Sequence, residues 1–342
     1  MALNLELVAW TEQQLAVLKI EKKDFMPIVG DAGFRQYFRL HTTPALLAVY
    51  GPPDIEKHEQ FAQISDHWRA HNIKAPRVYA HDFERGFLLI EDFGQHSLAD
   101  QLQYCPTLAD AAVVYSAPLQ HLRALQSVPT ASFYPLYSAD LLLQELHLFT
   151  EWFVAGLLNI VLTEPEKNQL QSLFDAAVAQ LLAQPNVIVH RDFHCRNIQV
   201  LADQNVGVID FQDAVFGPVT YDLVSLLKDC YQLWPKTFVQ TEALKYRQTL
   251  PAHLAMANDA VFLQAFNLMG WQRHMKVLGI FARLALRDNK MRYIDDLPRV
   301  IAYVRDAMNE CGLLMPLKNW FDSRIFSVAK NQPWFNSVAI QP

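Results

Sequence analysis

The spacing of apolar residues changes near Glu91, and this change constrains the fold more than any other feature of the chain. Before it, five short apolar or alternating runs are typical of β-strands. They occupy residues 26–29, 34–40, 45–50, 77–81 and 86–90. Between the third and fourth runs, residues 54–71 repeat apolar side chains at roughly helical intervals after Pro53. The order predicts three strands, one helix and two more strands, the last two joined by a short hairpin.

After Glu91 the sequence carries signals for helices. Three Ser/Thr-x-x-acid patterns, which mark helix starts, occur at Ser97–Asp100, Thr107–Asp110 and Thr163–Glu166. The most apolar long segment, 141–162, is interrupted by polar residues, so we expect a buried amphipathic helix and not a membrane span of about 20 apolar residues. Strand-like runs return only at 187–190, 198–201 and 206–209. We therefore predict an α+β protein of two lobes, residues 1–93 and 94–342.

Composition excludes several classes of protein. The 342 residues are 51% hydrophobic, enough for more than one typical domain, and the net charge of -6 offers no basic surplus for nucleic acid. Four scattered cysteines disfavour a disulfide framework or a structural zinc site. Glu6 and Glu12 lie where an export signal needs positive charge and then an apolar stretch, so we expect a cytoplasmic protein.

One stretch carries the chemistry. Residues 190–197 read HRDFHCRN and match the pattern H-R-D-x-x-x-x-N, and residues 206–211 then end in Asp-Phe after a short hairpin. A carboxylate at Asp192 can orient an acceptor hydroxyl and take its proton, while Asn197 and Asp210 can hold magnesium between phosphates. Each residue alone is commonplace, because Asp and Asn favour turns. Together they predict phosphoryl transfer from ATP.

Longer strings support this prediction. The segments GDAGFRQYFR, LLIEDFG, VHRDFHCRN, GVIDFQDAVFGPVTYDLVSLLKDCY and MKVLGIFARL resemble the aminoglycoside phosphotransferase and choline kinase superfamily, relatives of protein kinases. Within it they are similar to bacterial kinases that phosphorylate N-acetylmuramate and N-acetylglucosamine at C1. The resemblance spans about residues 25–304. It implies a two-lobed protein-kinase-like fold, with a small antiparallel-sheet lobe for the nucleotide, a larger helical lobe for catalysis and acceptor, and ATP and Mg²⁺ as cofactors.

The resemblance also assigns roles to residues. Asp192 would be the catalytic base, Asn197 and Asp210 the metal ligands, and Asp222 a structural residue that steadies the catalytic loop. The hairpin 30–39 would cover the ATP phosphates, although Gly30 and Gly33 are also what a simple turn requires. The hinge that meets adenine would be formed by Glu91, Asp92 and Phe93.

Two departures from the family pattern concern the phosphates. The third strand, 45–50, contains no cation where the superfamily usually has a lysine. Our hypothesis is that Arg39 or Lys57 supplies the missing charge. Gln212 replaces the Gly of the Asp-Phe-Gly motif, which argues against a flipping activation segment but leaves the chemistry of Asp210 intact.

Candidates for acceptor binding are weaker. Arg196 is placed beside Asn197 to pair with an anionic group such as the lactyl carboxylate of N-acetylmuramate. His194 and Asp213 could also contact acceptor, although packing and an exposed acid are the simpler interpretations. Glu145 and Trp152 share a helical face, and here a solvated acid and a core tryptophan are favoured. The basic cluster Arg273, His274 and Lys276 is most simply a solvated face.

The implied partner is a small amino sugar, with no nucleic acid and no membrane. The setting would be peptidoglycan recycling in a Gram-negative bacterium, with a functional link to a sugar-1-phosphate nucleotidyltransferase. Two alternatives stay open: another small-molecule kinase, acting on an aminoglycoside, a choline-like alcohol or a different sugar, and a kinase-like module that binds nucleotide without turnover.

Overall fold

A computed structural model describes residues 4–21, 24–28 and 34–335 of the chain. The chain forms two compact units. The first unit comprises residues 1–128 and 196–213, and the second comprises 129–195 and 214–342. The chain therefore passes between the units three times. The proposed boundary between residues 93 and 94, which concerns nucleotide and catalytic lobes, stays a prediction.

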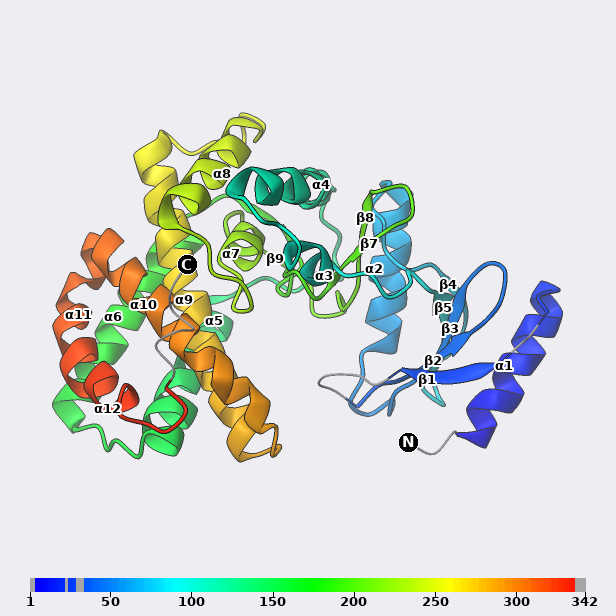
Figure 1. Ribbon diagram of the computed structural model, residues 1–342, viewed down its shortest axis with the longest axis horizontal. Coiled ribbons are helices and arrows are strands. Elements are labelled where there is room, and N and C mark those ends of the chain that lie inside the picture. The colour runs from blue at the N-terminus through cyan, green and yellow to red at the C-terminus, as the bar shows by residue number, and fades with distance from the viewer. Residues whose placement is uncertain (1–3, 22–23, 29–33, 336–342) are drawn as a thin grey trace. The chain divides into compact units, whose positions relative to one another are not determined.

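The first unit is built on a five-stranded antiparallel sheet in the order β1-β2-β3-β5-β4 (Figure 1). The strands are β1 (Phe25–Ile28), β2 (Gln36–Leu40), β3 (Leu46–Tyr50), β4 (Val78–Asp82) and β5 (Phe87–Glu91), and α2 (His58–Ala70) follows β3. The predicted order of three strands, a helix and two strands is confirmed. Gly86, with φ 71°, completes the hairpin from β4 to β5.

One face of the sheet is covered by α1 (Leu5–Leu18), which sequence analysis did not predict. The buried side chains alternate along the strands, as the two-residue period of a strand requires. The resulting core consists of Leu7, Trp10 and Leu15 of α1 with Phe38, Leu40, Leu46, Ala48, Phe87 and Leu89 of the sheet. Asn4 begins the helix, because its side chain accepts hydrogen bonds from the backbone N–H groups of Glu6 and Leu7.

The rest of the first unit follows β5. It contains α3 (Leu98–Leu102), α4 (Leu108–Gln126) and the hairpin of β7 (Ile198–Val200) and β8 (Val206–Val208). Ser97 and Thr107 cap α3 and α4, so these two predicted helix starts are confirmed. The hairpin returns to this unit although it lies some seventy residues further along the chain.

The second unit is mainly helical and is organised around α9 (Asp259–Leu286). Residues 266–279 of this helix are all buried, as expected of a helix that neighbours cover on every side. It packs against α5 (Ala139–Leu148), η1 (Phe149–Leu157), α7 (Tyr221–Leu227) and α10 (Leu297–Glu310) (Figure 1). The predicted helix over 141–162 is present, but it widens into the π-helix η1 at Phe149.

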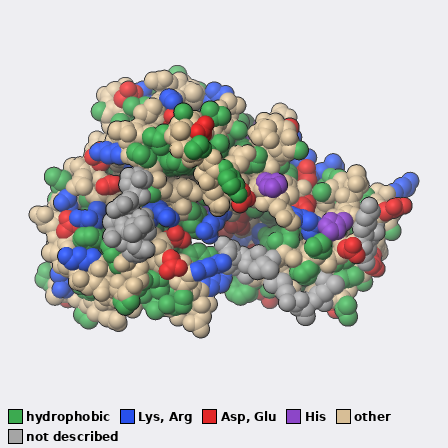
Figure 2. Space-filling model, in the orientation of Figure 1, with side chains coloured by type: hydrophobic (Ala, Val, Ile, Leu, Met, Phe, Trp, Pro, Cys, Tyr) green, Lys and Arg blue, Asp and Glu red, His purple; other side chains and the backbone are tan. Residues whose placement is uncertain are grey.

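Smaller elements complete the second unit. A two-stranded sheet pairs β6 (Asn186–Val189) with β9 (Val215–Pro218), and Thr163 caps α6 (Glu164–Leu182) as predicted. The remaining elements are α8 (Lys236–Gln248), η2 (Met291–Asp296), η3 (Gly312–Leu314), α11 (Met315–Trp320), η4 (Phe321–Phe326) and α12 (Ser327–Ala329). Within the part of the chain that the structure describes, every helix is too short or too polar to span a bilayer. Figure 2 shows cationic and anionic side chains interspersed over one face of the molecule.

Candidate active site

The loop that carries Asp192 begins where the buried strand β6 ends. Asp222, at the start of α7, accepts hydrogen bonds from the backbone N–H groups of His190 (2.6 Å) and Arg191 (3.0 Å). Burial raises the pKa of Asp222 to about 7, although these two hydrogen bonds favour its ionised form. The prediction that Asp222 steadies the loop is confirmed.

A second aspartate anchors the other end of the same loop. Asp229 accepts a hydrogen bond from the backbone N–H of Cys195 at 2.8 Å and is itself buried. Between the anchors, the backbone N–H of His194 donates to the carbonyl of Asp192 at 3.0 Å. Sequence analysis missed Asp229, which lies just after the end of α7.

Arg191 adopts a backbone conformation that costs energy. Its φ of 76° lies in the left-handed region, which bulky side chains rarely occupy. Its guanidinium donates to Glu145 at 2.6 Å while Asp222 holds its backbone. Such strain persists where surrounding contacts over-determine it, and it is common at functional sites.

Glu145 is the centre of a buried polar network in the second unit. Its side chain is 5% exposed, and its Oε1 receives both Arg191 and Lys276, the latter at 2.9 Å. Its Oε2 accepts from the Tyr137 hydroxyl (2.5 Å) and from the Gln272 amide (3.0 Å). The interpretation of Glu145 as a solvated acid is therefore wrong. Two cations and two further donors compensate its desolvation.

The cations of this network surround Asp192. Burial opposes ionisation of Asp192, but the charges of Lys276, His194, Arg191 and Arg273 lower its pKa to about 2. Arg273 and Lys276 are 3% and 7% exposed, so the interpretation of their cluster as a solvated face is wrong. Asp192 is consequently an ionised carboxylate at neutral pH.

The other two residues of the motif lie in the first unit, because the chain passes between the units at residues 195 and 196. Asn197 precedes β7 and Asp210 follows β8, and the backbone N–H of Ile209 donates to the carbonyl of Asn197 at 3.0 Å. The hairpin thus brings the amide and the carboxylate to the same end of two paired strands. Asp210 has a φ of 66°, a second strained position in the motif.

The three residues after Asp210 each contact another residue of the first unit. Phe211 is fully buried and stacks on Phe61 of α2 at a centroid distance of 4.5 Å. Gln212 donates its amide to Oδ1 of Asp210 at 2.9 Å. Asp213 pairs with Lys57 at 2.7 Å, so the structure joins two residues that were predicted separately to contact acceptor and nucleotide.

The residues of the predicted hinge form hydrogen bonds and ring contacts with their neighbours in the first unit. The carboxylate of Asp92 accepts a hydrogen bond from Nη2 of Arg39 at 2.9 Å, and the backbone N–H of Asp92 donates to the carbonyl of Ala45, the residue before β3. Glu91 accepts from Arg69 at 2.9 Å. The ring of Phe93 lies over Gly207, where a Cβ would come within 2.5 Å of it. Arg39, predicted near the phosphates, binds Asp92 and the carbonyl of Gly94 at the predicted hinge.

Five further residues predicted to bind nucleotide or acceptor are Gly30, Gly33, Arg196, Trp152 and His194. Gly30 and Gly33 lie outside the described residues. Arg196 is exposed at the start of the returning segment. Trp152 is half-buried in η1, and because the chain widens there, the α-helical period that would align it with Glu145 does not apply. His194 packs edge-on against Tyr231 at 5.5 Å.

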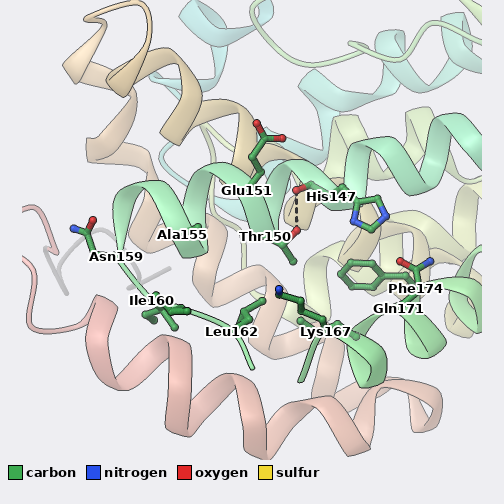
Figure 3. Close-up of a pocket in the computed structure, with 12 residues that line it drawn as sticks. His147, Thr150, Glu151, Ala155, Asn159, Ile160, Leu162, Lys167, Gln171 and Phe174 are labelled. Carbon is green, nitrogen blue, oxygen red and sulfur yellow. Dashed lines mark hydrogen bonds between the residues drawn. The ribbon is translucent and has the colours of Figure 1, made fainter. Parts of the chain in front are cut away.

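A cavity of about 530 Å³ lies elsewhere in the second unit, between η1, the following loop and α6 (Figure 3). His147, Asn159, Lys167 and Phe174 are among the residues that line it, and the hydroxyl of Thr150 donates to the carbonyl of His147 at 2.9 Å. It is lined by none of the predicted catalytic, metal or nucleotide residues. We therefore place the candidate active site at the catalytic loop instead.

Two features define a phosphotransferase of the protein-kinase-like class. One is the fold, a sheet followed by a helical unit, and the other is the anchored H-R-D-x-x-x-x-N loop with its Asp-Phe partner. Comparison with known proteins agrees. Residues 24–257 match the model of the phosphotransferase enzyme family. The chain belongs to this family and is a small-molecule kinase.

Several relatives are similar over most of their length. N-acetylmuramate/N-acetylglucosamine kinase of Pseudomonas aeruginosa is 37% identical, covering 85% of each chain. The enzyme of the same name from Neisseria meningitidis is 36% identical, covering 84% of this chain and 86% of its own.

Solved structures share the fold at low identity. ADP-bound aminoglycoside phosphotransferase APH(2'')-Ib aligns with a TM-score of 0.60 at 14% identity, covering 87% of this chain and 97% of that one. Choline kinase LicA of Streptococcus pneumoniae aligns with a TM-score of 0.60 at 9% identity, covering 88% and 99%.

Proposed function

We propose that the protein transfers the γ-phosphoryl group of ATP to the anomeric hydroxyl of N-acetylmuramate and N-acetylglucosamine, in peptidoglycan recycling. The acceptor follows from relatives of that name at 36–37% identity that match most of the chain. An ATP donor is supported by the ADP bound in a neighbour of the same fold. The product would be a sugar 1-phosphate, which suits a nucleotidyltransferase as the next enzyme.

The observation that carries the proposal is the state of Asp192. Its loop is anchored at both ends by Asp222 and Asp229, and nearby cations hold its pKa near 2. A carboxylate in this state can orient the acceptor hydroxyl, and it can receive the proton once the new bond to phosphorus makes that hydroxyl acidic, while the bond to the departing ADP breaks. Positioning contributes much of the rate, since phosphoryl transfer needs little covalent chemistry from the protein.

The donor set at the hairpin fits magnesium. Asn197 and Asp210 offer an amide oxygen and a carboxylate, the hard ligands that Mg²⁺ prefers, and phosphates and water would complete the shell. Among the described residues there is no group of three or more His, Cys, Asp or Glu that could hold a metal. That result is compatible with a site of two protein ligands. When bound, the ion would neutralise charge on the phosphates.

Charge supports an acidic acceptor over a cationic one. Arg191, Arg273 and Lys276 lie close enough to Asp192 to lower its pKa, and Arg191 and Lys276 are also ion-paired with Glu145. Aminoglycosides and choline are cations and would favour an acidic surrounding. The lactyl carboxylate of N-acetylmuramate suits this environment, and Arg196 is our proposed contact for it.

The deciding experiment measures ATP consumption with magnesium and a panel of acceptors: N-acetylmuramate, N-acetylglucosamine, kanamycin, choline and none. We expect turnover with the two sugars and a C1 phosphate by phosphorus NMR. Asp192→Asn should lower kcat by about 10²- to 10⁴-fold while ATP still binds. Turnover with kanamycin or choline alone would overturn the sugar assignment. If the protein bound ATP but consumed none with any acceptor, a non-catalytic module would be favoured.

The same panel tests Arg196. Arg196→Ala should raise the KM for N-acetylmuramate and leave that for N-acetylglucosamine nearly unchanged, because only the former has a carboxylate to pair. Equal losses on both sugars would contradict the role.

A further inference from the structure

The strand that usually supplies the phosphate-binding lysine has no cation here, and the structure places another basic residue nearby. Arg35 directly precedes β2, and its side chain is only 7% exposed. Its Nε lies 2.9 Å from Oε2 of Glu56, whose side chain is 14% exposed. Its guanidinium also lies over the ring of Phe61 at 5.5 Å.

The two candidates chosen from the sequence are engaged elsewhere. Arg39 is bound to the carboxylate of Asp92 and to the carbonyl of Gly94 at the hinge. Lys57 pairs with Asp213, and its side chain is 56% exposed. A residue that stabilises transferring phosphates should be preorganised and shielded from water, where its charge acts more strongly. Arg35 meets that requirement better than either.

A single side chain links Arg35 to Asp210. Nη1 of Arg35 donates to Oε1 of Gln212 at 2.9 Å, and Nε2 of Gln212 donates to Oδ1 of Asp210 at 2.9 Å. An amide is the neutral group that can accept from a guanidinium and donate to a carboxylate at once. This bridge gives a physical reason for Gln at the position where the kinase motif has Gly.

Arg35 keeps donors for a ligand. Its Nη2 is buried and meets the geometry of a hydrogen bond with none of the residues that the structure describes, while the hydroxyl of Tyr37 lies close to the guanidinium. A buried donor without a partner is costly, so a site of this kind commonly awaits an acceptor. Guanidinium groups bind phosphate oxygens through charge-assisted hydrogen bonds.

We propose that Arg35 is the cation that binds the nucleotide phosphates in place of the missing lysine, with Glu56 holding it and Gln212 coupling it to Asp210. Arg35 is then a catalytic residue that contacts the nucleotide, and Gln212 is a positioning residue. The inference rests on the proposed use of ATP, but not on the acceptor.

The test measures ATP binding by calorimetry, with and without magnesium and without acceptor. Arg35→Met should weaken binding by about 10- to 100-fold, the loss expected for a charge-assisted hydrogen bond. Gln212→Met should weaken ATP binding less than Arg35→Met does. It should also raise the magnesium concentration at which half of the magnesium-dependent increase in ATP affinity is reached. Arg85→Met is the matched control, because Arg85 forms an exposed ion pair with Asp82 in the same unit. It should bind ATP like the wild type.

A second experiment asks whether Arg35 and Gln212 act together through the bridge or independently of each other. In a double-mutant cycle, the Arg35→Met and Gln212→Met losses should be clearly less than additive, because each breaks the same bridge. Additive losses would overturn the link, and unchanged affinity in a folded Arg35→Met protein would overturn the role of Arg35. If the wild-type protein bound ATP but did not phosphorylate the sugars, only the acceptor proposal would be overturned. No binding of ATP or GTP by the wild type would overturn both.

Discussion

Glu145 shows how strongly one buried charge depends on its partners. It faces Arg191, Lys276, Tyr137 and Gln272 in the interior of the second unit. Removing one partner of such a network leaves uncompensated charge in a medium of low polarity, which costs far more than breaking an exposed pair. The same change would release Arg191, whose strained backbone belongs to the predicted catalytic loop.

We expect Glu145→Ala to lower the free energy of unfolding by about 3–5 kcal/mol, measured by urea denaturation. Glu164→Ala is the control, because Glu164 and Lys167 form an ion pair with side chains 78% and 55% exposed. That pair should contribute less than about 1 kcal/mol. Similar losses in the two variants would show that the Glu145 network is not a principal source of stability.

At the residue scale, local spacing was the reliable guide. Asp192 and Asn197 could be proposed because the motif lies within one loop, whereas the role of Asp222 was implied by the resemblance to the superfamily. The burial of Glu145 could not be proposed from local spacing, because its ion-pair partners Arg191 and Lys276 lie 46 and 131 residues further along the chain. The pairing of Arg39 with Asp92 likewise depends on the fold, so the sequence could not show that Arg39 is engaged there.

Among the helices of the second unit, α9 passes close to the end of α5. A Cβ on Gly279 would lie 2.3 Å from the carbonyl carbon of Leu148, a backbone atom that cannot move without shifting its helix. Leu148 is the last residue before the chain widens into η1. Glycine at position 279 thus permits the contact on which this part of the helical core is built.

Gly279→Ala should therefore destabilise the protein by about 1–3 kcal/mol, the usual cost of overpacking a core, and lower its Tm. Gly312→Ala serves as the control, because an added Cβ there meets no atom within 4 Å. Thermal unfolding of both variants checks the prediction, which would be wrong if they shifted Tm equally.

Elements with local signals were predicted well. Ser97, Thr107 and Thr163 cap helices as expected, because a cap needs only residues within one turn. The helix α1 escaped notice because the exposed Leu5 and Val17 blur its apolar face. The change to a π-helix at Phe149 also has no local signal that we could identify.

For the whole molecule, stability should depend on pH through a buried histidine. Burial and the charge of Arg273 lower the pKa of His274 to about 3, and its Nε2 donates to the carbonyl of Lys228 at 2.8 Å. An unfolded chain would bind a proton there near pH 6.5. Between these two values the unfolded state binds more protons, so stability is full above pH 6.5 and falls as the pH drops.

Between pH 7.5 and 5, His274 alone should cost about 2 kcal/mol of stability. His274→Gln keeps a donor and should remove that part of the pH dependence, whereas exposed His253→Gln should not. Urea denaturation at the two pH values measures the difference. An equal pH dependence in wild type and His274→Gln would contradict the assignment.

The division of the chain into units could not be foreseen from periodicity, because residues 196–213 join residues 1–128 only through tertiary packing. This has a consequence for synthesis on the ribosome. The first unit lacks β7, β8 and Phe211 until residue 213 has emerged, which is 85 residues after its first segment ends. At 5–20 residues per second the delay is roughly 4–17 s. During that time Phe61 and Trp68 lack Phe211, the aromatic ring they will contact, so the first unit cannot complete this aromatic cluster until its returning segment has been made.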